Sequence, residues 1–141
     1  MTRALALARE AAVAGEVPVG AVVTDRAGNI LGEAGNLTRT RHDPTAHAEI
    51  LAIRQAAKTL ANERLTDCTL WVTLEPCPMC AAAIAEARIA RLVYGAPDPK
   101  GGGVEHGPMV FNHSRHRPEI IAGIAEQESA RLLRGFFAAR R

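Results

Sequence analysis

The sequence has few cysteines, few aromatic residues and little excess charge of either sign. Its 141 residues include 3 cysteines, an odd number that does not form the disulfide framework of a small secreted protein. A formal net charge of +2 is no argument by itself for a nucleic-acid partner. No apolar run approaches membrane-spanning length, and the first residues lack the apolar core of a signal peptide. We therefore expect a cytoplasmic protein without membrane attachment.

The overall composition is that of an ordinary globular protein. Hydrophobic residues make up 48% of the chain and charged residues 23%, enough apolar material for a substantial core. The length fits one domain, and neither an internal repeat nor a low-complexity linker interrupts it. We expect residues 1–141 to form a single domain.

Two short motifs hold the residue types that bind zinc. His47 precedes Glu49 by two positions, and Cys77 precedes Cys80 by three. One imidazole and two thiolates suit zinc better than magnesium or calcium. Three protein ligands leave one tetrahedral position for water, which is typical of a catalytic zinc site. The pattern predicts one Zn²⁺ per chain, held by His47, Cys77 and Cys80, with Glu49 moving protons beside it.

The spacing within each motif predicts where it lies on a helix. Cys77 and Cys80 share one face of a first helical turn, and Pro78 fits just inside that helix start. His47 and Glu49 are two residues apart, and mid-helix they would point to different sides. They converge only if His47 lies at the start of its helix, which the preceding Asp-Pro-Thr favours.

Each motif alone has other interpretations. The two cysteines could be small buried hydrophobic residues or a redox pair, His47 a surface histidine and Glu49 a solvated charge. Together they match the zinc deaminase signature H-x-E…P-C-x-x-C. Cys68 lies outside this spacing and is expected to be a small buried residue. His106, His113 and His116 have no regular spacing to the motifs and are expected at the surface.

The rest of the chain predicts alternating helices and strands. Helices are expected over 2–14, from the His47 motif to about 61, over 78–87 and over 124–139. Strands are expected over 17–24, 30–34, 69–74, 91–95 and, as a short one, 120–121. The first two strands form an antiparallel hairpin, and helical crossovers imply parallel neighbours beyond it. This order predicts a layered α/β domain. The glycine-rich loop at 98–103 lacks the G-K-[ST] ending of a phosphate-binding loop.

Four stretches resemble the bacterial tRNA-specific adenosine deaminases of the cytidine deaminase-like superfamily. They are residues 16–22, 41–50 and 72–80 and the tail Phe136-Phe137 with Arg140-Arg141. The zinc motif marks the superfamily, whereas the Asp-Pro-Thr-Ala-His-Ala-Glu run and the aromatic–basic tail point to the tRNA branch. The segment 101–106 differs from the sequence typical of that branch, so the resemblance assigns no RNA contacts over 101–116.

The resemblance implies a three-layer α/β/α fold with a five-stranded mixed sheet, a homodimer, and hydrolytic deamination of adenosine to inosine at the tRNA wobble position. It implies that Asn36 hydrogen-bonds the base, with the backbone of Ala48 helping to position it. It places Asp98 near the ribose of the anticodon loop. The tail residues that it assigns to RNA contact are Phe136, Phe137, Arg140 and Arg141.

The residues alone leave alternatives for the tail and for the function. Phenylalanines beside arginines could stack on bases next to phosphate contacts, but a terminal helix also commonly packs its aromatic residues into the core. The same zinc chemistry would serve a deaminase of a free base or nucleoside, such as guanine or cytosine. A non-catalytic zinc-stabilised RNA-binding module is a third possibility, against which Glu49 argues because a structural site needs no proton shuttle.

Overall fold

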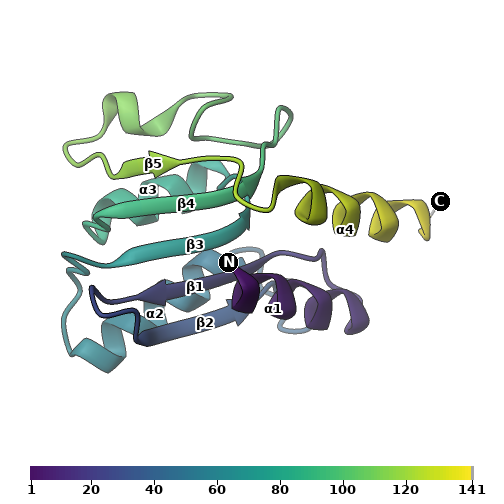
Figure 1. Cartoon of the computed structure of the whole chain (residues 1–141), viewed down its shortest axis with the longest axis horizontal. Helices are drawn as coiled ribbons and strands as arrows, with labels where there is room; N and C mark the ends of the chain where they lie inside the picture. The colour runs from purple at the N-terminus through teal and green to yellow at the C-terminus, as the bar shows by residue number, and fades with distance from the viewer. Residues whose placement is uncertain (141) are drawn as a thin grey trace.

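The computed structural model describes residues 1–140 and contains helices and strands in alternation (Figure 1). In chain order they are α1 (Thr2–Val13), β1 (Gly20–Thr24), β2 (Ile30–Gly35), α2 (Ala48–Leu60), β3 (Thr69–Leu74), α3 (Pro78–Glu86), β4 (Arg91–Ala96), the 3₁₀ helix η1 (Val110–His113), β5 (Glu119–Ile121) and α4 (Glu126–Ala138). None of the helices in the described part is long and apolar enough to cross a membrane.

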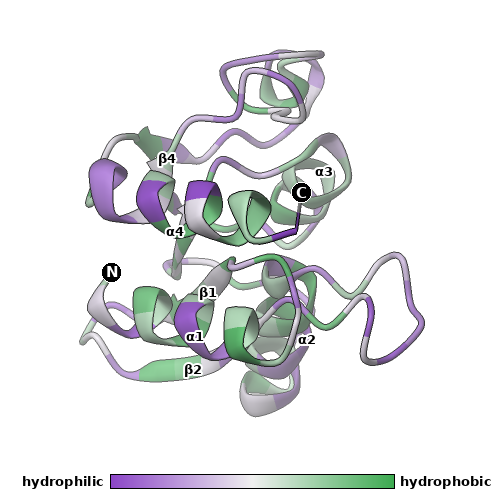
Figure 2. Ribbon diagram, turned by 90° about the vertical axis from the view of Figure 1, so that its right-hand side faces the viewer, coloured by the Kyte–Doolittle hydropathy of each residue, from purple (hydrophilic) through white to green (hydrophobic). Residues whose placement is uncertain are grey.

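The five strands form one mixed sheet between two layers of helices. Their order is β2-β1-β3-β4-β5. β1 pairs antiparallel with β2 and β3, whereas β3–β4 and β4–β5 are parallel. Helices α1 and α4 lie on one face of the sheet and α2 and α3 on the other (Figures 1 and 2). The expected three-layer α/β/α fold with a five-stranded mixed sheet is therefore confirmed.

The main core lies between the sheet and the layer of α2 and α3. Leu70 and Val72 of β3 and Leu92 of β4 are fully buried there. β3 is the central strand and is covered on both faces, which explains its nearly continuous apolar sequence. Cys68 is buried in the same core, as expected.

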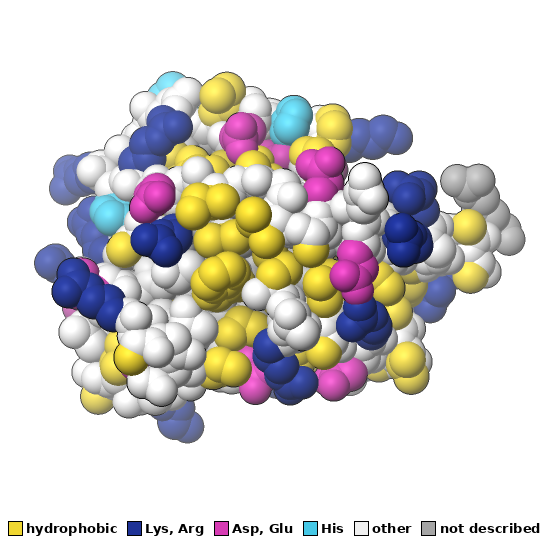
Figure 3. Space-filling view, in the orientation of Figure 1, with side chains coloured by type: hydrophobic (Ala, Val, Ile, Leu, Met, Phe, Trp, Pro, Cys, Tyr) yellow, Lys and Arg dark blue, Asp and Glu magenta, His cyan; other side chains and the backbone are white. Residues whose placement is uncertain are grey.

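The opposite face of the sheet is covered less completely. Hydrophobic side chains gather over its middle, with basic and acidic side chains around them (Figure 3). Trp71 packs there against the small cluster of Ala4, Leu7 and Val22, and its indole N–H donates to Thr24 Oγ1 at 3.0 Å. Gly20 allows α1 to approach closely, because a Cβ at this position would lie 2.0 Å from the carbonyl oxygen of Ala4.

Two expected element boundaries were wrong. The first strand begins at Gly20 rather than at residue 17, because Pro18 has no N–H and the N–H of Val19 is used in a tight turn to the Val17 carbonyl. The last helix begins at Glu126 rather than at residue 124. Ala125 has a φ of 58°, a left-handed conformation that cannot belong to the helix it precedes.

Candidate metal and catalytic site

His47 is the residue that directly precedes the first turn of α2. Its φ of −71° and ψ of 150° are extended, so its side chain does not follow the helical spiral that starts at Ala48. Glu49 lies within that first turn and is almost fully buried, with 4% of its surface exposed. This helix start lets two residues spaced by two reach one cavity, as the sequence predicted.

Cys77, like His47, is the residue that directly precedes the first turn of its helix, α3. It is extended, with a φ of −69° and a ψ of 170°, and Pro78 occupies the first helical position. Pro78 suits that position because its missing N–H would have no partner inside the helix. Cys80 follows on the first turn and is fully buried. The parallel strands on either side of α3 end at this edge of the sheet, so the turn after β3 brings both thiols to α2.

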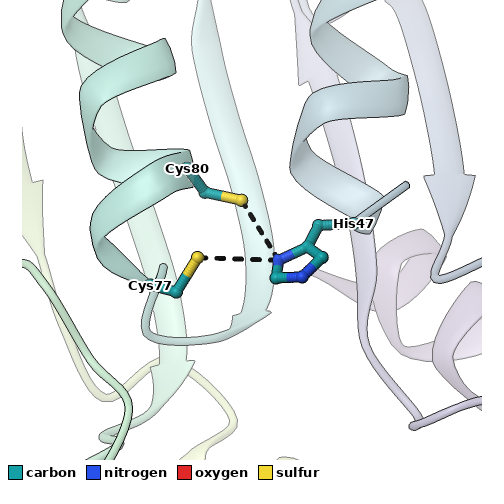
Figure 4. A group of neighbouring side chains, drawn as sticks. All are labelled: His47, Cys77 and Cys80. Atoms are coloured by element: carbon teal, nitrogen blue, oxygen red, sulfur yellow. Dashed lines mark hydrogen bonds between the residues drawn. The ribbon is translucent and has the colours of Figure 1, made fainter. Parts of the chain in front are cut away.

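The side chains of His47, Cys77 and Cys80 converge (Figure 4). His47 Nδ1 lies 3.6 Å from the sulfur of Cys77 and 3.4 Å from that of Cys80. All three ligand atoms lie within 4.8 Å of one another, and no other such group occurs among residues 1–140. Tetrahedral zinc with bonds of about 2.1 Å to nitrogen and 2.3 Å to sulfur would hold these atoms about 3.6 Å apart. The residues therefore fit a zinc ion without rearrangement.

The electrostatics of the group favour a negative charge on one thiol. The hydrogen bond from Cys80, with a further one from His47, lowers the pKa of Cys77 to about 4. The same hydrogen bond to Cys77 and burial raise the pKa of Cys80, so the pair shares one proton. The hydrogen bond with Cys77 raises the pKa of His47. The thiolate of Cys77 is ready to bind a metal cation, and the proton that Cys80 keeps would be released when both sulfurs bind the metal.

Glu49 is the acid–base group beside these ligands. Burial raises the pKa of its carboxyl group above the usual range. Buried carboxyl groups with raised pKa values are typical of general acids and bases, because they can hold and release a proton near neutral pH.

A cavity of about 280 Å³ opens above this group. Asn36, Glu49 and His47 line it together with Asp98. The side-chain oxygen of Asn36 accepts a hydrogen bond of 2.8 Å from the N–H of Ala48, which fixes the orientation of the amide. The N–H of Ala48 is thus engaged by Asn36, and the amide nitrogen of Asn36 is the group left to donate to a ligand.

A second cavity of about 460 Å³ adjoins the first and has a more apolar wall. Asp98 and Gly101 line both cavities, and Leu133 and Phe137 of α4 line only the second. Lys100 is the cationic residue in its lining. The two cavities together exceed what a single base needs.

The two phenylalanines of the tail have different environments. Phe136 is 5% exposed, and the guanidinium groups of Arg39 and Arg140 lie over its ring, at 5.8 Å and 3.6 Å from the ring centre. Phe137 is 49% exposed. The stacking surface expected from both rings is therefore reduced to Phe137, because Phe136 is already stacked within the protein. Arg141 lies outside the described residues.

Comparisons with known proteins agree with this arrangement. The sequence model of the MafB19-like deaminase family matches residues 1–141. The chain is 53% identical to a tRNA-specific adenosine deaminase of Agrobacterium fabrum, over 100% of this chain and 93% of that protein. This chain belongs to the tRNA-specific adenosine deaminase family. The resemblance noted in the sequence is thereby confirmed.

Solved structures support the assignment to this deaminase family. One, from a study of A-to-I editing by tRNA:A34 deaminases at the wobble position of transfer RNA, superimposes with a TM-score of 0.90 and 52% identity, covering 92% of this chain and 95% of that one. A guanine deaminase of Bacillus subtilis is more distant, with a TM-score of 0.65 and 33% identity over 99% of this chain and 90% of its own.

Sequence analysis missed two buried carboxylates that hold the loops around this deaminase site. Glu16 accepts hydrogen bonds from the backbone of Arg39 and Thr40 and from the Thr40 hydroxyl. Burial raises the pKa of Glu16, but these hydrogen bonds outweigh that effect and the net pKa is lowered. Glu75 is surrounded in the same way, and burial again opposes a net lowering of its pKa by the hydrogen bonds. Glu75 directly follows the apolar strand β3, and Glu16 precedes the apolar residues Val17, Pro18 and Val19, positions at which a buried charge could have been noticed.

Three of the histidines outside the motif, His106, His113 and His116, were expected at the surface, and two of them have specific partners. His106 Nδ1 lies 2.7 Å from Glu75 Oε1, and His116 Nε2 lies 2.6 Å from the carbonyl oxygen of Ile89. His113 is exposed, as expected. None of the three belongs to the metal-ligand group.

Proposed function

We propose that this chain, with residues 1–141 as a single deaminase domain, converts adenosine to inosine at the wobble position of tRNA by hydrolysis. The observation that carries the proposal is the convergence of His47, Cys77 and Cys80 beside buried Glu49, in a cavity that Asn36 also lines. The deaminases of matching sequence and structure, named for tRNA and for wobble editing, support this choice of substrate.

His47, Cys77 and Cys80 would hold one Zn²⁺, because their ligand atoms have the separations that tetrahedral zinc requires. Bound zinc supplies a water molecule that is acidic enough to act as a nucleophile near neutral pH. His47, Cys77 and Glu49 all line the cavity, so a water held by the metal would be within reach of both Glu49 and a bound base.

Glu49 carries the proton transfers. Its carboxylate takes a proton from the attacking water and delivers it to N1 of the adenine ring as the C6–O bond forms. It then takes the second proton of the same oxygen and gives it to the C6 amino group, which leaves as ammonia when the C–N bond breaks. Burial raises the pKa of this carboxyl group, which favours its holding a proton between the two transfers.

Asn36 positions the base for these steps. Its side-chain oxygen is engaged by the Ala48 N–H, so its amide nitrogen donates to an acceptor on the purine. Asp98 also lines this cavity, and we assign it a place near the ribose of the same nucleotide.

The adjoining apolar cavity favours an RNA over a free base. Phe137 offers a half-exposed ring for base stacking, and Lys100 offers a cation for a phosphate. Arg140 would add a positive charge just after α4, and we assign Arg141, which lies outside the described residues, to RNA contact as well. An anticodon loop suits this arrangement because its bases are already partly unstacked.

We further propose a cytoplasmic homodimer. The exposed face of α3 carries Met79 and Ala82, and small side chains let a second copy approach closely. Sedimentation of the purified protein at micromolar concentration tests this, and a monomer under those conditions would contradict it.

The decisive experiment compares four substrates with one preparation of the zinc-loaded protein. These are an anticodon stem-loop with adenosine at the wobble position, free adenosine, guanine and cytosine. We expect inosine from the stem-loop and little turnover of the other three. Turnover of guanine with none of the stem-loop would instead support a free-base deaminase, like the more distant structural relative.

A further inference from the structure

Glu75 lies directly after β3 and its side chain is fully buried. Oε1 accepts a hydrogen bond from the N–H of Asp98 at 3.0 Å and lies 2.7 Å from His106 Nδ1. Oε2 accepts three more, from the N–H groups of Val104, Glu105 and His106 at 3.2, 3.0 and 3.2 Å. One carboxylate thus holds both ends of the loop from residue 98 to residue 106.

The same loop packs against the turn that carries the first metal-ligand cysteine. The N–H of Gly103 donates to the carbonyl of Pro76 at 2.8 Å. A Cβ on Gly102 would lie 2.4 Å from Glu75 Oε2, and a Cβ on Gly103 would lie 2.6 Å from Pro78 Cα. The adjacent glycines therefore serve a close approach to Glu75 and to the start of α3, which is a use for this glycine-rich segment other than phosphate binding.

A carboxylate is the side chain that this arrangement requires. It has two oxygens that only accept hydrogen bonds, and all the surrounding groups are donors. A glutamine would replace one oxygen by an NH₂ group that faces N–H groups, leaving donors without a partner in a buried place.

The loop that Glu75 holds is also a wall of the substrate site. Asp98 and Gly101 line both the catalytic cavity and the apolar cavity beside it. The path of this loop sets where Asp98 and Gly101 lie relative to a bound nucleotide, and the hydrogen bonds of Glu75 hold the loop in place.

We propose that Glu75 is a positioning residue for substrate: through its hydrogen bonds to the loop 98–106, it sets where Asp98 meets the nucleotide. This inference deepens the proposed deaminase function and rests on it. Glu75 itself does not touch the reacting atoms, so its effect belongs in substrate binding rather than in the proton transfers of Glu49.

The test uses Glu75→Gln in the full-length, zinc-loaded protein. We expect KM for the wobble-adenosine stem-loop to rise about tenfold and kcat to stay within about threefold, since the zinc ligands and Glu49 are unchanged. In a double-mutant cycle, adding Asp98→Ala to Glu75→Gln should raise KM little further, because both substitutions remove the same contact between Asp98 and the nucleotide. The backbone N–H groups of Val104 and Glu105 should also lose their slow hydrogen exchange.

Leu65→Ala is the control for loss of stability alone. Leu65 is fully buried away from the cavity, so this variant should lower the melting temperature and leave KM unchanged. An unchanged KM in folded, zinc-loaded Glu75→Gln, or effects of Glu75→Gln and Asp98→Ala that simply add, would overturn the proposal.

If Glu75→Gln does not fold, His106→Ala tests the proposal in its place. It removes one donor and keeps the carboxylate, so KM should rise by about two- to fivefold, and an unchanged KM would overturn the proposal. Failure of the proposed function would look different, because wild-type protein would then not deaminate the stem-loop.

Discussion

The floor and the rim of the catalytic cavity are built in different ways. The floor comprises His47, Glu49, Cys77 and Cys80. The rim comprises Asp98, Lys100 and Phe137. Each floor residue sits at the start of a helix, so its position follows from a few neighbouring residues. The rim is held by contacts between residues far apart in the sequence, such as Asp98 with Glu75. The residues that carry the chemistry are thus positioned by local geometry, whereas the residues that select the substrate are positioned by long-range packing.

Loss of a floor ligand should have the largest effect. We expect Cys80→Ala to lose most of its zinc and its turnover, because two ligands bind zinc much more weakly than three. Metal analysis and a deamination assay measure both effects. Cys68→Ala is a matched control, since Cys68 is also buried but lies outside the ligand group, and it should keep both zinc and activity. Full zinc occupancy in Cys80→Ala would remove Cys80 from the site.

Glu49→Gln should lower turnover nearly as much as Cys80→Ala does, but this variant should keep its zinc. General acid–base groups typically contribute about 10²- to 10⁴-fold, and Glu49 serves two proton transfers, so we expect a loss at or beyond the top of that range. Single-turnover deamination of the stem-loop measures it, with RNA binding measured in parallel. Glu63→Gln, an exposed change, is the control. Activity of Glu49→Gln within about tenfold of wild type would be too high for a proton shuttle.

Asn36 joins the floor to the rim and should show an intermediate effect. Asn36→Ala removes a donor to the base and leaves the buried N–H of Ala48 without an acceptor, and we expect kcat/KM to fall about tenfold to a hundredfold. Asn36→Asp keeps the acceptor for Ala48 and loses the donor. If Asn36→Asp retains wild-type kcat/KM, the side-chain nitrogen does not bind the base.

The contrast between floor and rim explains what could be predicted from the sequence. The place of each motif at a helix start followed from its spacing and from Pro78, and the meeting of His47 with the cysteines was predicted from the joint zinc deaminase signature. The order of all five strands was not predicted, but the antiparallel hairpin and the parallel neighbours beyond it followed from the strand patterns and crossovers. The buried roles of Glu16 and Glu75 did not, because the partners of each lie in loops more than 20 residues away. Burial of the tail phenylalanines was left open by the sequence, which could not tell Phe136 from Phe137, because one of the contacts of Phe136 is with Arg39, nearly a hundred residues away in the chain.

Phe137 should give the smallest effect and separates the two tail residues. Phe137→Ala removes a ring that is half exposed and lines the apolar cavity beside Lys100 and Leu133. Stacking of a base on an aromatic ring is worth about 1–3 kcal/mol, and the partly covered ring should lie near the lower value, so we expect KM for the stem-loop to rise several-fold with an unchanged melting temperature. KM for free adenosine should not change.

Phe136→Ala is the matched change one residue earlier. It removes a buried ring that two guanidinium groups contact, so we expect it to destabilise the fold by about 3 kcal/mol. Deletion of the whole tail would mix these two effects, which is why single substitutions are needed. If Phe137→Ala leaves KM for the stem-loop unchanged, or raises KM for free adenosine equally, the apolar cavity does not hold a neighbouring nucleotide, and the selection of RNA over a free base must come from another part of the rim.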